Sequence, residues 1–198
     1  MDKVRFIWDD GGELPGLAIE QENARRRTLQ EHFRAAAEEI ARAFAGIDSV
    51  VRIVLFGSVA SELSKEVPAD HRFAGSGPVF LHQCRDVDLA VWMDPNHPMK
   101  DLQRRRVEAL RRLLELHAIG IPHHRVDVYI LDGRDGSYRG RLCDFRKCPA
   151  GKFVCEIKDC GSIPFLRVHE GFVFDSGVFA RRPHVVLLDR GIAPHFSA

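Results

Sequence analysis

The stretch RIVLFGS, from Arg52 to Ser58, decides the fold together with RDVDLAVWMD from Arg85 to Asp94 and RVDVYIL from Arg125 to Leu131. Each stretch is short and rich in β-branched and aliphatic residues, and its polar residues stand at one end or on alternate positions, which is typical of a β-strand. The first strand, predicted over Val50–Phe56, ends at Gly57, where a residue without a side chain lets backbone amides turn toward a ligand. We therefore expect three strands that carry polar groups at the edge of an apolar sheet.

Acidic residues occupy alternate positions of the second and third predicted strands. In the second strand, over 86–93, Asp86 and Asp88 alternate with apolar residues, so both carboxylates lie on one face, about 6–7 Å apart. In the third strand, Asp127 also points away from the apolar face. Three converging carboxylates offer the hard oxygen ligands that Mg²⁺ prefers, and divalent ions can neutralise the negative charge around a phosphorus atom. The pattern predicts a metal-dependent phosphate chemistry.

Two amphipathic helices are predicted, from about Glu22 to Gly46 and from about Met99 to His117, because each has apolar residues at helical spacing. The fold class is therefore α/β, a small mixed β-sheet with helices packed behind it. Residues from about Glu62 to Gln83 show little periodicity and are predicted as a loop or a small excursion. The composition changes near Gly136, so we expect a core with its N-terminal helix over 1–135 and a cysteine-rich C-terminal segment over 136–198.

Composition limits the class of protein. The 198 residues are 45% hydrophobic and 29% charged, and 29 basic residues nearly balance 28 acidic ones. Such a balance gives no global attraction to polyanions, so any affinity for nucleic acid would be local. The N-terminus has no apolar run long enough for a signal peptide, and no stretch approaches the roughly 20 apolar residues that span a bilayer. We expect a cytoplasmic protein with no membrane contact.

The order Gly57-Ser58, then Asp86-Val87-Asp88, then Asp127 resembles the DNA polymerase β nucleotidyltransferase superfamily, especially its minimal nucleotidyltransferase proteins. The resemblance covers roughly Val50 to Leu131. It implies that Gly57 and Ser58 bind nucleotide phosphates, that Asp86 and Asp88 bind two Mg²⁺ ions, and that Asp127 binds the catalytic ion and helps activate the attacking hydroxyl. The implied activity transfers a nucleoside monophosphate from an NTP to a hydroxyl on a protein, nucleic acid or small molecule.

The chain departs from the family pattern in two places. The family usually has a basic residue and then a glycine shortly after the Gly-Ser pair, whereas here Ser61 and Glu62 stand in those places. The gap between Ser58 and Asp86 is also longer than usual, so an insertion at 62–83 lies beside the expected nucleotide entrance. Some minimal family members act as antitoxins on a partner encoded beside them, so a helical toxin is one partner that the resemblance suggests. The alternative is a catalytically inactive binding module that engages a protein or nucleic acid.

Four of the five cysteines form two C-x4-C pairs separated by six residues: Cys143, Cys148, Cys155 and Cys160. In a reducing compartment, such a cluster points to metal ligation before disulfides, and four thiolates are the usual ligand set of structural Zn²⁺. Metal binding would supply folding energy to a segment with few large apolar groups. Free thiols packed under the sheet, or redox-active pairs, are the alternatives. His169 could replace one thiol, and Cys84 is interpreted as a buried small residue.

Two further groups allow a functional and a structural interpretation. A basic run on the second predicted helix could contact phosphates of a nucleic acid, although such runs more often form a solvated helix face; it consists of Arg104, Arg105, Arg106, Arg111 and Arg112. Three aromatic residues near the C-terminus could stack on bases, but their alternation is more typical of strand positions that face a core; they are Phe165, Phe172 and Phe174.

Overall fold

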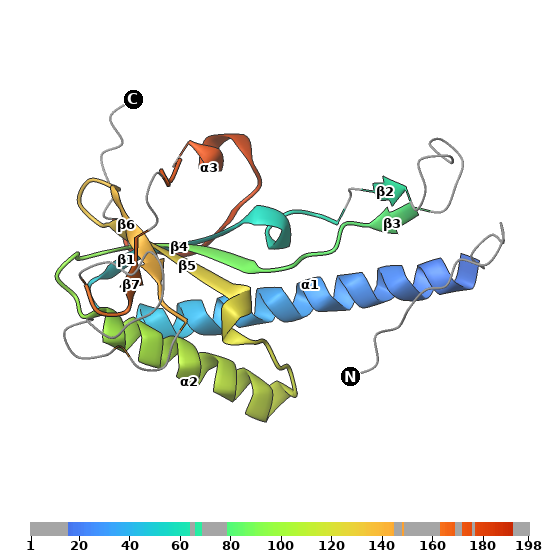
Figure 1. Ribbon diagram of the computed structural model, residues 1–198, viewed down its shortest axis with the longest axis horizontal. Helices are drawn as coiled ribbons and strands as arrows, with labels where there is room; N and C mark the ends of the chain where they lie inside the picture. The colour runs from blue at the N-terminus through green and yellow to red at the C-terminus, as the bar shows by residue number, and fades with distance from the viewer. Residues whose placement is uncertain are drawn as a thin grey trace. The chain divides into compact units, whose positions relative to one another are not determined.

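The computed structural model describes residues 16–63, 66–68, 79–144, 148, 163–168, 172–175 and 177–191. The helices in these ranges are α1 (Gly16–Ala45), α2 (Met99–His117) and α3 (Val178–Arg181). The strands are β1 (Val50–Phe56), β2 (Glu66–Pro68), β3 (Val79–Leu81), β4 (Val87–Met93), β5 (Val126–Asp132), β6 (Tyr138–Leu142), β7 (Leu166–Arg167) and β8 (Val185–Asp189). Figure 1 shows these elements coloured along the chain. None of the helices in this part of the chain is both long and apolar enough to span a bilayer.

Two compact units make up the chain. The first contains α1 up to Leu29 together with β2 and β3, and the second contains the rest of α1 and the remaining strands. The expected division between residues 1–135 and 136–198 does not coincide with these units, because the described strands beyond residue 136 pair with strands that precede it.

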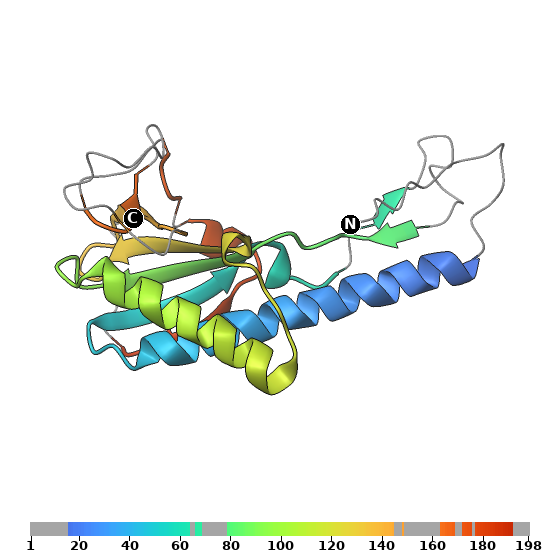
Figure 2. The ribbon, with the colours of Figure 1, turned by 60° about the horizontal axis from the view of Figure 1, so that its bottom comes forward.

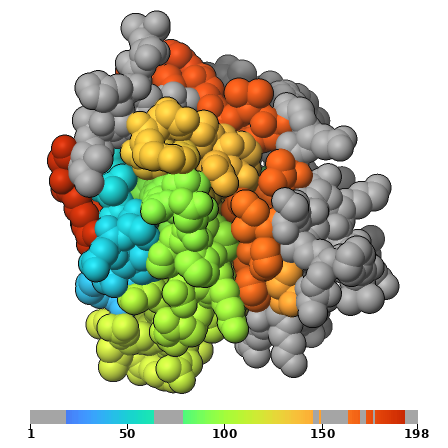
Figure 3. Space-filling view, turned by 90° about the vertical axis from the view of Figure 1, so that its left-hand side faces the viewer, coloured from blue at the N-terminus to red at the C-terminus, as the bar shows by residue number. Residues whose placement is uncertain are grey.

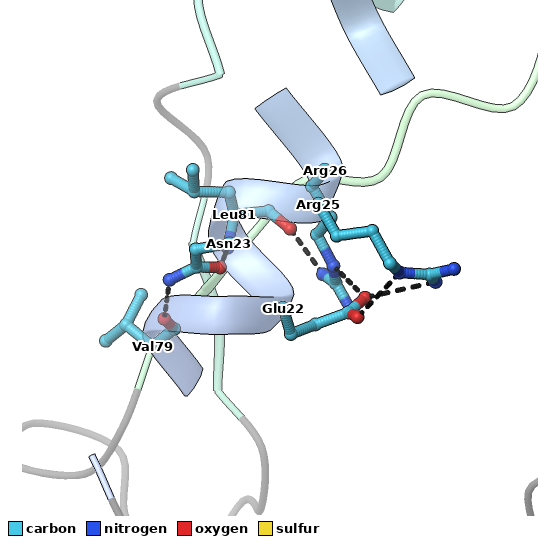
Figure 4. Close-up of polar contacts among 6 residues, drawn as sticks. All are labelled: Glu22, Asn23, Arg25, Arg26, Val79 and Leu81. Carbon is cyan, nitrogen blue, oxygen red and sulfur yellow. Dashed lines mark hydrogen bonds and ion pairs between the residues drawn. The ribbon is translucent and has the colours of Figure 1, made fainter. Parts of the chain in front are cut away.

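In the first unit, the helix is joined to a strand by side-chain hydrogen bonds. Strands β2 and β3 pair in antiparallel fashion, within the stretch that was predicted as a loop or a small excursion. Asn23 of α1 donates from Nδ2 to the carbonyl of Val79 at 3.1 Å, and its Oδ1 accepts from the backbone N–H of Leu81 at 2.8 Å (Figure 4). Arg26 donates to the carbonyl of Leu81, and Glu22 holds the Arg26 side chain at 2.9 Å. One asparagine thus pairs with the strand as a neighbouring strand would.

A six-stranded mixed sheet forms the centre of the second unit, in the order β7-β6-β5-β4-β1-β8. Only β4 and β5 run parallel, and the other neighbours are antiparallel. Parallel strands need a crossover connection, and here α2 lies in the crossover between β4 and β5. Both α2 and the second half of α1 cover one face of the sheet, as Figure 2 shows.

The two faces of this sheet carry different side chains, because residues alternate between faces along each strand. The helix side is an apolar core, to which α1 contributes the buried residues Phe33, Ala36, Ala37, Ile40 and Phe44. Strand residues that alternate with the acids, such as Leu89 and Val128, are fully buried. The opposite face has a second cluster made of Val51, Val54, Ala90, Trp92 and Leu131, against which Phe56, Phe174 and Phe179 pack.

Backbone hydrogen bonds between neighbouring strand ends extend the pairing at one end of the sheet. The backbone N–H of Asp94, after β4, donates to the carbonyl of Ser49 at 3.0 Å, and Gly133 donates to the carbonyl of Met93 at 2.8 Å. Figure 3 shows this end, with the start of β1 in cyan, the segment after β4 in green and the β5–β6 turn in yellow. The predicted acidic residues stand at the other end of β4 and β5, where the strands begin.

The expected mixed α/β sheet with packed helices is confirmed. Strand β1 and helix α2 have the predicted bounds, and the apolar stripe of α1 is buried as expected. Within the apolar stripe expected for α2, Leu102, Leu110 and Leu113 are buried, whereas Leu114 is 54% exposed.

Candidate carboxylate site

Two of the predicted acids are neighbours across the parallel pair of strands. Asp88 of β4 and Asp127 of β5 are register partners, and both alternate with the apolar residues that face the helices. Asp86 directly precedes β4, and its negative charge reaches the carboxyl of Asp88. The parallel register therefore brings Asp127 to the sheet end where Asp86 and Asp88 lie, from a separate stretch of sequence.

Gly57 lies directly against one of these carboxylates. Strand β1 is antiparallel to β4, and Phe56, its last residue, pairs with Asp88. The next residue, Gly57, has φ +76°, and a Cβ at this position would overlap Oδ2 of Asp88. Any side chain here would both strain the backbone and displace the carboxylate. Glycine is therefore required at this position by the place that Asp88 occupies.

Ser58 follows within a short 3₁₀ turn, Gly57–Val59. The carbonyls of this turn are bound from α1: Gln30 donates from Nε2 to Ser58 at 3.2 Å, and Arg34 donates from Nε to Val59 at 2.9 Å. The carbonyl of Ser61 also accepts from both side chains, at 2.7 and 3.0 Å. The helix thus fixes the backbone of the Gly-Ser turn beside the acids.

The Asp88 carboxyl is electrostatically unfavourable in its charged form. Burial is the main cause, and the negative charges of Asp127 and Asp86 add to it, so that the pKa of Asp88 rises from 3.8 to about 7. Arg141 opposes this change only in part. Near neutral pH, this carboxyl therefore lacks a sufficient positive charge in its surroundings.

An arginine holds the carboxylate of Asp127. Arg141 of β6 donates from Nη1 to Oδ2 of Asp127 at 2.7 Å, and the two side chains are 21% and 19% exposed. Burial nevertheless raises the pKa of Asp127 above its ordinary value, against the opposing effect of Arg141. A second pair is looser, because Arg125 lies 3.6 Å from Asp86 and both of these side chains are 44% exposed.

Aromatic rings cover the sheet beside the acids. Tyr129 lies two residues after Asp127. Its ring centroid is 5.6 Å from those of Phe56 and Phe174 and 6.0 Å from that of Phe172, which stacks on it. Burial, with the charges of Asp88 and Asp127, raises the pKa of the Tyr129 phenol. These rings exclude water from one side of the carboxylates, which explains why burial dominates the pKa of Asp88.

The donor set suits Mg²⁺, because three carboxylates supply hard oxygen ligands and the raised pKa of Asp88 marks a deficit of positive charge. In the ranges that the structure describes, however, no three His, Cys, Asp or Glu side chains are grouped closely enough to hold a metal ion.

The predicted zinc cluster lies mostly outside the described residues, since nothing is described of Cys155 and Cys160. Cys143 is buried, follows β6, and donates its backbone N–H to the carbonyl of Phe165 at 2.8 Å. Cys148 is partly buried, and neither thiol is in a disulfide. Cys84 is buried as predicted, and burial raises the pKa of its thiol, which disfavours the reactive thiolate.

The interpretation of the basic run on α2 as a solvated helix face holds for Arg104, Arg111 and Arg112, which are 54%, 68% and 54% exposed, but is wrong for Arg106. Arg106 is fully buried and donates to the carbonyl of Cys143 at 2.8 Å and toward Asp144 at 3.4 Å. Arg105 donates to the carbonyl of Ala43 at 3.0 Å. The three others have carboxylate partners within the protein: Arg104 with Glu108, Arg111 with Glu115 and Arg112 with Glu39.

The aromatic residues near the C-terminus pack against the protein, but the interpretation of their alternation as strand positions is wrong, because none of the three lies within a strand. Phe165 is buried directly before β7, whereas Phe172 and Phe174 lie outside the strands and cover the acidic face of the sheet. Phe172 retains 44% exposure.

Arg141 is the residue at this site that no sequence motif indicated. It reaches Asp127 because β5 and β6 form an antiparallel pair in which Arg141 is opposite Tyr129. The signal was present in the turn: the glycines at 133 and 136, between two strand-like stretches, are typical of a hairpin connection. A hairpin at this point would have placed β6 beside β5.

The chain matches no known protein-family model, no curated protein and no solved structure.

Proposed function

We propose that this protein is a Mg²⁺-dependent nucleotidyltransferase that transfers a nucleoside monophosphate from an NTP to a hydroxyl acceptor. The observation that carries the proposal is the register of Asp88 with Asp127, with Gly57 packed against the Asp88 carboxylate. Burying Asp88 beside Asp127 is costly unless positive charge compensates both carboxylates, and Arg141 offsets the raised pKa of Asp88 only in part, which favours a bound cation.

Asp86 and Asp88 would hold both metal ions, and Asp127 would bind the catalytic ion and accept the proton of the attacking hydroxyl. When bound, the divalent ions neutralise the charge that develops on the attacking and leaving oxygens. The backbone amides of Gly57 and Ser58 would bind the phosphates, supported by the hydrogen bonds from α1 that fix this turn. The aromatic rings around Tyr129 would keep water from the acids.

The acceptor is a protein, a nucleic acid or a small molecule. A helical toxin partner remains among the protein acceptors because of the resemblance to minimal nucleotidyltransferases. Nucleic acid is favoured less than the sequence suggested, since the basic run on α2 is occupied by internal contacts.

The second candidate function is a binding module or antitoxin without catalysis. The observation that favours it is that two of the three acids already have arginine partners, Arg141 at 2.7 Å and Arg125 at 3.6 Å. An ion-paired acid can serve a structural role without any metal.

We further propose that Cys143, Cys148, Cys155 and Cys160 hold a structural Zn²⁺. The support is their two C-x4-C spacings and the position of Cys143 directly after β6, where a metal would tie the segment to the sheet.

The enzyme proposal is tested by calorimetric titration of each of the four NTPs, with Mg²⁺, into the wild-type protein and into Asp86→Ala/Asp88→Ala. We expect metal-dependent binding of at least one NTP that the double variant loses while it remains folded. The NTP that binds is then supplied in labelled form to search for the acceptor. A folded wild type that binds none of the four would refute the enzyme and leave the binding module.

A further inference from the structure

The Arg141–Asp127 pair joins the guanidinium of Arg141 to the carboxylate of a proposed metal ligand. Its 2.7 Å separation is that of a charge-assisted hydrogen bond, and both side chains are mostly shielded from water. Arg141 occupies one lone pair of Oδ2 of Asp127, and its positive charge repels a divalent ion that approaches the same carboxylate. Arg141 and a metal ion therefore compete for Asp127.

Arg141 differs from the structural arginines of the protein in the partner that it binds. Arg106 and Arg34 donate to backbone carbonyls, which keep them in place whatever is bound at the site. Arg141 instead donates to a carboxylate that the proposed chemistry requires. Among the residues described, the Nε atoms of Arg141 and Arg106 both lack a hydrogen-bond partner, so the exchangeable carboxylate partner is what distinguishes Arg141.

The Gly-Ser turn provides no cation of its own. Residues 57–63 contain no lysine or arginine, and Glu62 adds a negative charge close to the place where phosphates would bind. Arg34, the nearest arginine bound to this turn, is occupied by the carbonyls of Val59 and Ser61. A triphosphate at this turn would need a cation from elsewhere in the site.

We propose that Arg141 exchanges partners: it holds Asp127 in the free protein and binds the phosphates of the nucleotide once a divalent ion takes Asp127. This inference rests on the proposed function. The exchange is chemically matched, because the planar guanidinium fork binds phosphate oxygens with the same geometry as carboxylate oxygens.

The test compares Arg141→Met, which keeps the length and removes the charge, with Arg141→Lys and with Arg139→Met as the matched control. Arg139 is also on β6, but it lies 3.8 Å from Asp132, an acid that is not part of the site. Two affinities are measured by calorimetry for each variant: Mn²⁺ alone, and the Mg²⁺ complex of the NTP that the wild type binds best.

We expect the two affinities of Arg141→Met to change in opposite directions. Mn²⁺ alone should bind several-fold more tightly, because Asp127 is freed, while the Mg²⁺·NTP complex should bind about tenfold or more weakly, because one charge-assisted contact is lost. Arg141→Lys should recover part of the nucleotide affinity, since it restores the charge without the fork. Arg139→Met should stay within about twofold of the wild type in both titrations.

Unchanged nucleotide affinity in a folded Arg141→Met would overturn the exchange and leave the nucleotidyltransferase proposal intact. A parallel loss of Mn²⁺ and nucleotide affinity would also overturn it, because it would show that Arg141 only supports the fold of the site. A wild type that binds no NTP would refute the proposed function itself, and the phosphate role of Arg141 with it.

Discussion

Replacing Asp88 by asparagine is expected to stabilise the protein at alkaline pH at the expense of its metal site. The carboxyl has a pKa of about 7 in place of 3.8, because it is buried next to the charges of Asp127 and Asp86. Its protonated form is therefore favoured in the folded state, and the contribution of this group to the free energy of unfolding decreases as the pH rises from about 4 to about 7. Asparagine carries no charge and removes this dependence.

The magnitude follows from the two pKa values. One pKa unit corresponds to about 1.4 kcal/mol, so a rise from 3.8 to about 7 corresponds to about 4 kcal/mol at pH 8. Relaxation around a partly buried carboxyl lowers this figure, and we expect Asp88→Asn to raise the free energy of unfolding by about 2–4 kcal/mol at pH 8. At pH 5 the gain should fall by more than half, because most of the carboxyl is then protonated in the folded wild type.

The assay is urea unfolding at pH 5 and pH 8 in buffer without divalent ions, followed by the fluorescence of the fully buried Trp92. Asp86→Asn is the control, since Asp86 is 44% exposed and its loose pair with Arg125 contributes at most about 1 kcal/mol. An Asp88→Asn effect of the same size at both pH values would refute the reasoning, as would destabilisation at pH 8.

Three further predictions follow from single positions. Gly57→Ala should lower the free energy of unfolding by about 1–3 kcal/mol and abolish NTP binding, because φ is +76° and the new Cβ displaces the Asp88 carboxylate. Urea unfolding measures the first effect and calorimetry the second. An unaltered NTP affinity would contradict the packing of Gly57 against Asp88. Arg106→Ala should lower the free energy of unfolding by about 3–5 kcal/mol, because it removes buried hydrogen bonds. Arg104→Ala, at a side chain that is 54% exposed, should change this free energy by less than about 0.5 kcal/mol. Equal effects of the two variants in urea unfolding would be inconsistent with the buried hydrogen bonds of Arg106. The purified protein should contain one Zn²⁺ per chain by metal analysis, and Cys155→Ser or Cys160→Ser should lose it; a wild type without zinc would leave the cysteines as free thiols or redox pairs.

Local patterns in the sequence were sufficient to predict several elements of the fold. Strand β1 and helix α2 have the predicted bounds because an apolar run ending in glycine and a strong helical stripe each reflect contacts near in sequence. The pairings of β8 with β1 and of β7 with β6 could not be predicted, because they depend on contacts between distant segments. Alternation fixes which face a residue occupies, but it does not say which strand lies beside it.

The acids of the candidate site were found because they form a recognisable order along the chain, whereas their arginine partners were not. Arg141 acts on Asp127 through the β5–β6 pairing, which only the turn at 133–136 hints at. Arg106 was misassigned although its position carried a signal: it lies four residues after Leu102 and four before Leu110, within the apolar stripe of α2. An arginine is rarely buried unless its polar groups are paired, so its place within the apolar stripe predicts buried hydrogen-bond partners for Arg106.

The position of β1 between β4 and β8 bears on how the chain folds during synthesis. Strand β1 pairs with β4 on one side, but its other neighbour, β8, is made much later; Arg190, directly after β8, bonds to Ile47 across 143 positions of sequence. Until the ribosome has released β8, one edge of β1 has unpaired backbone groups that can join another chain. Contacts of such long range are slow to form. The nascent chain therefore passes through a period in which β1 is an open edge strand exposed to misassembly, and premature termination before residue 185 would make that exposure permanent.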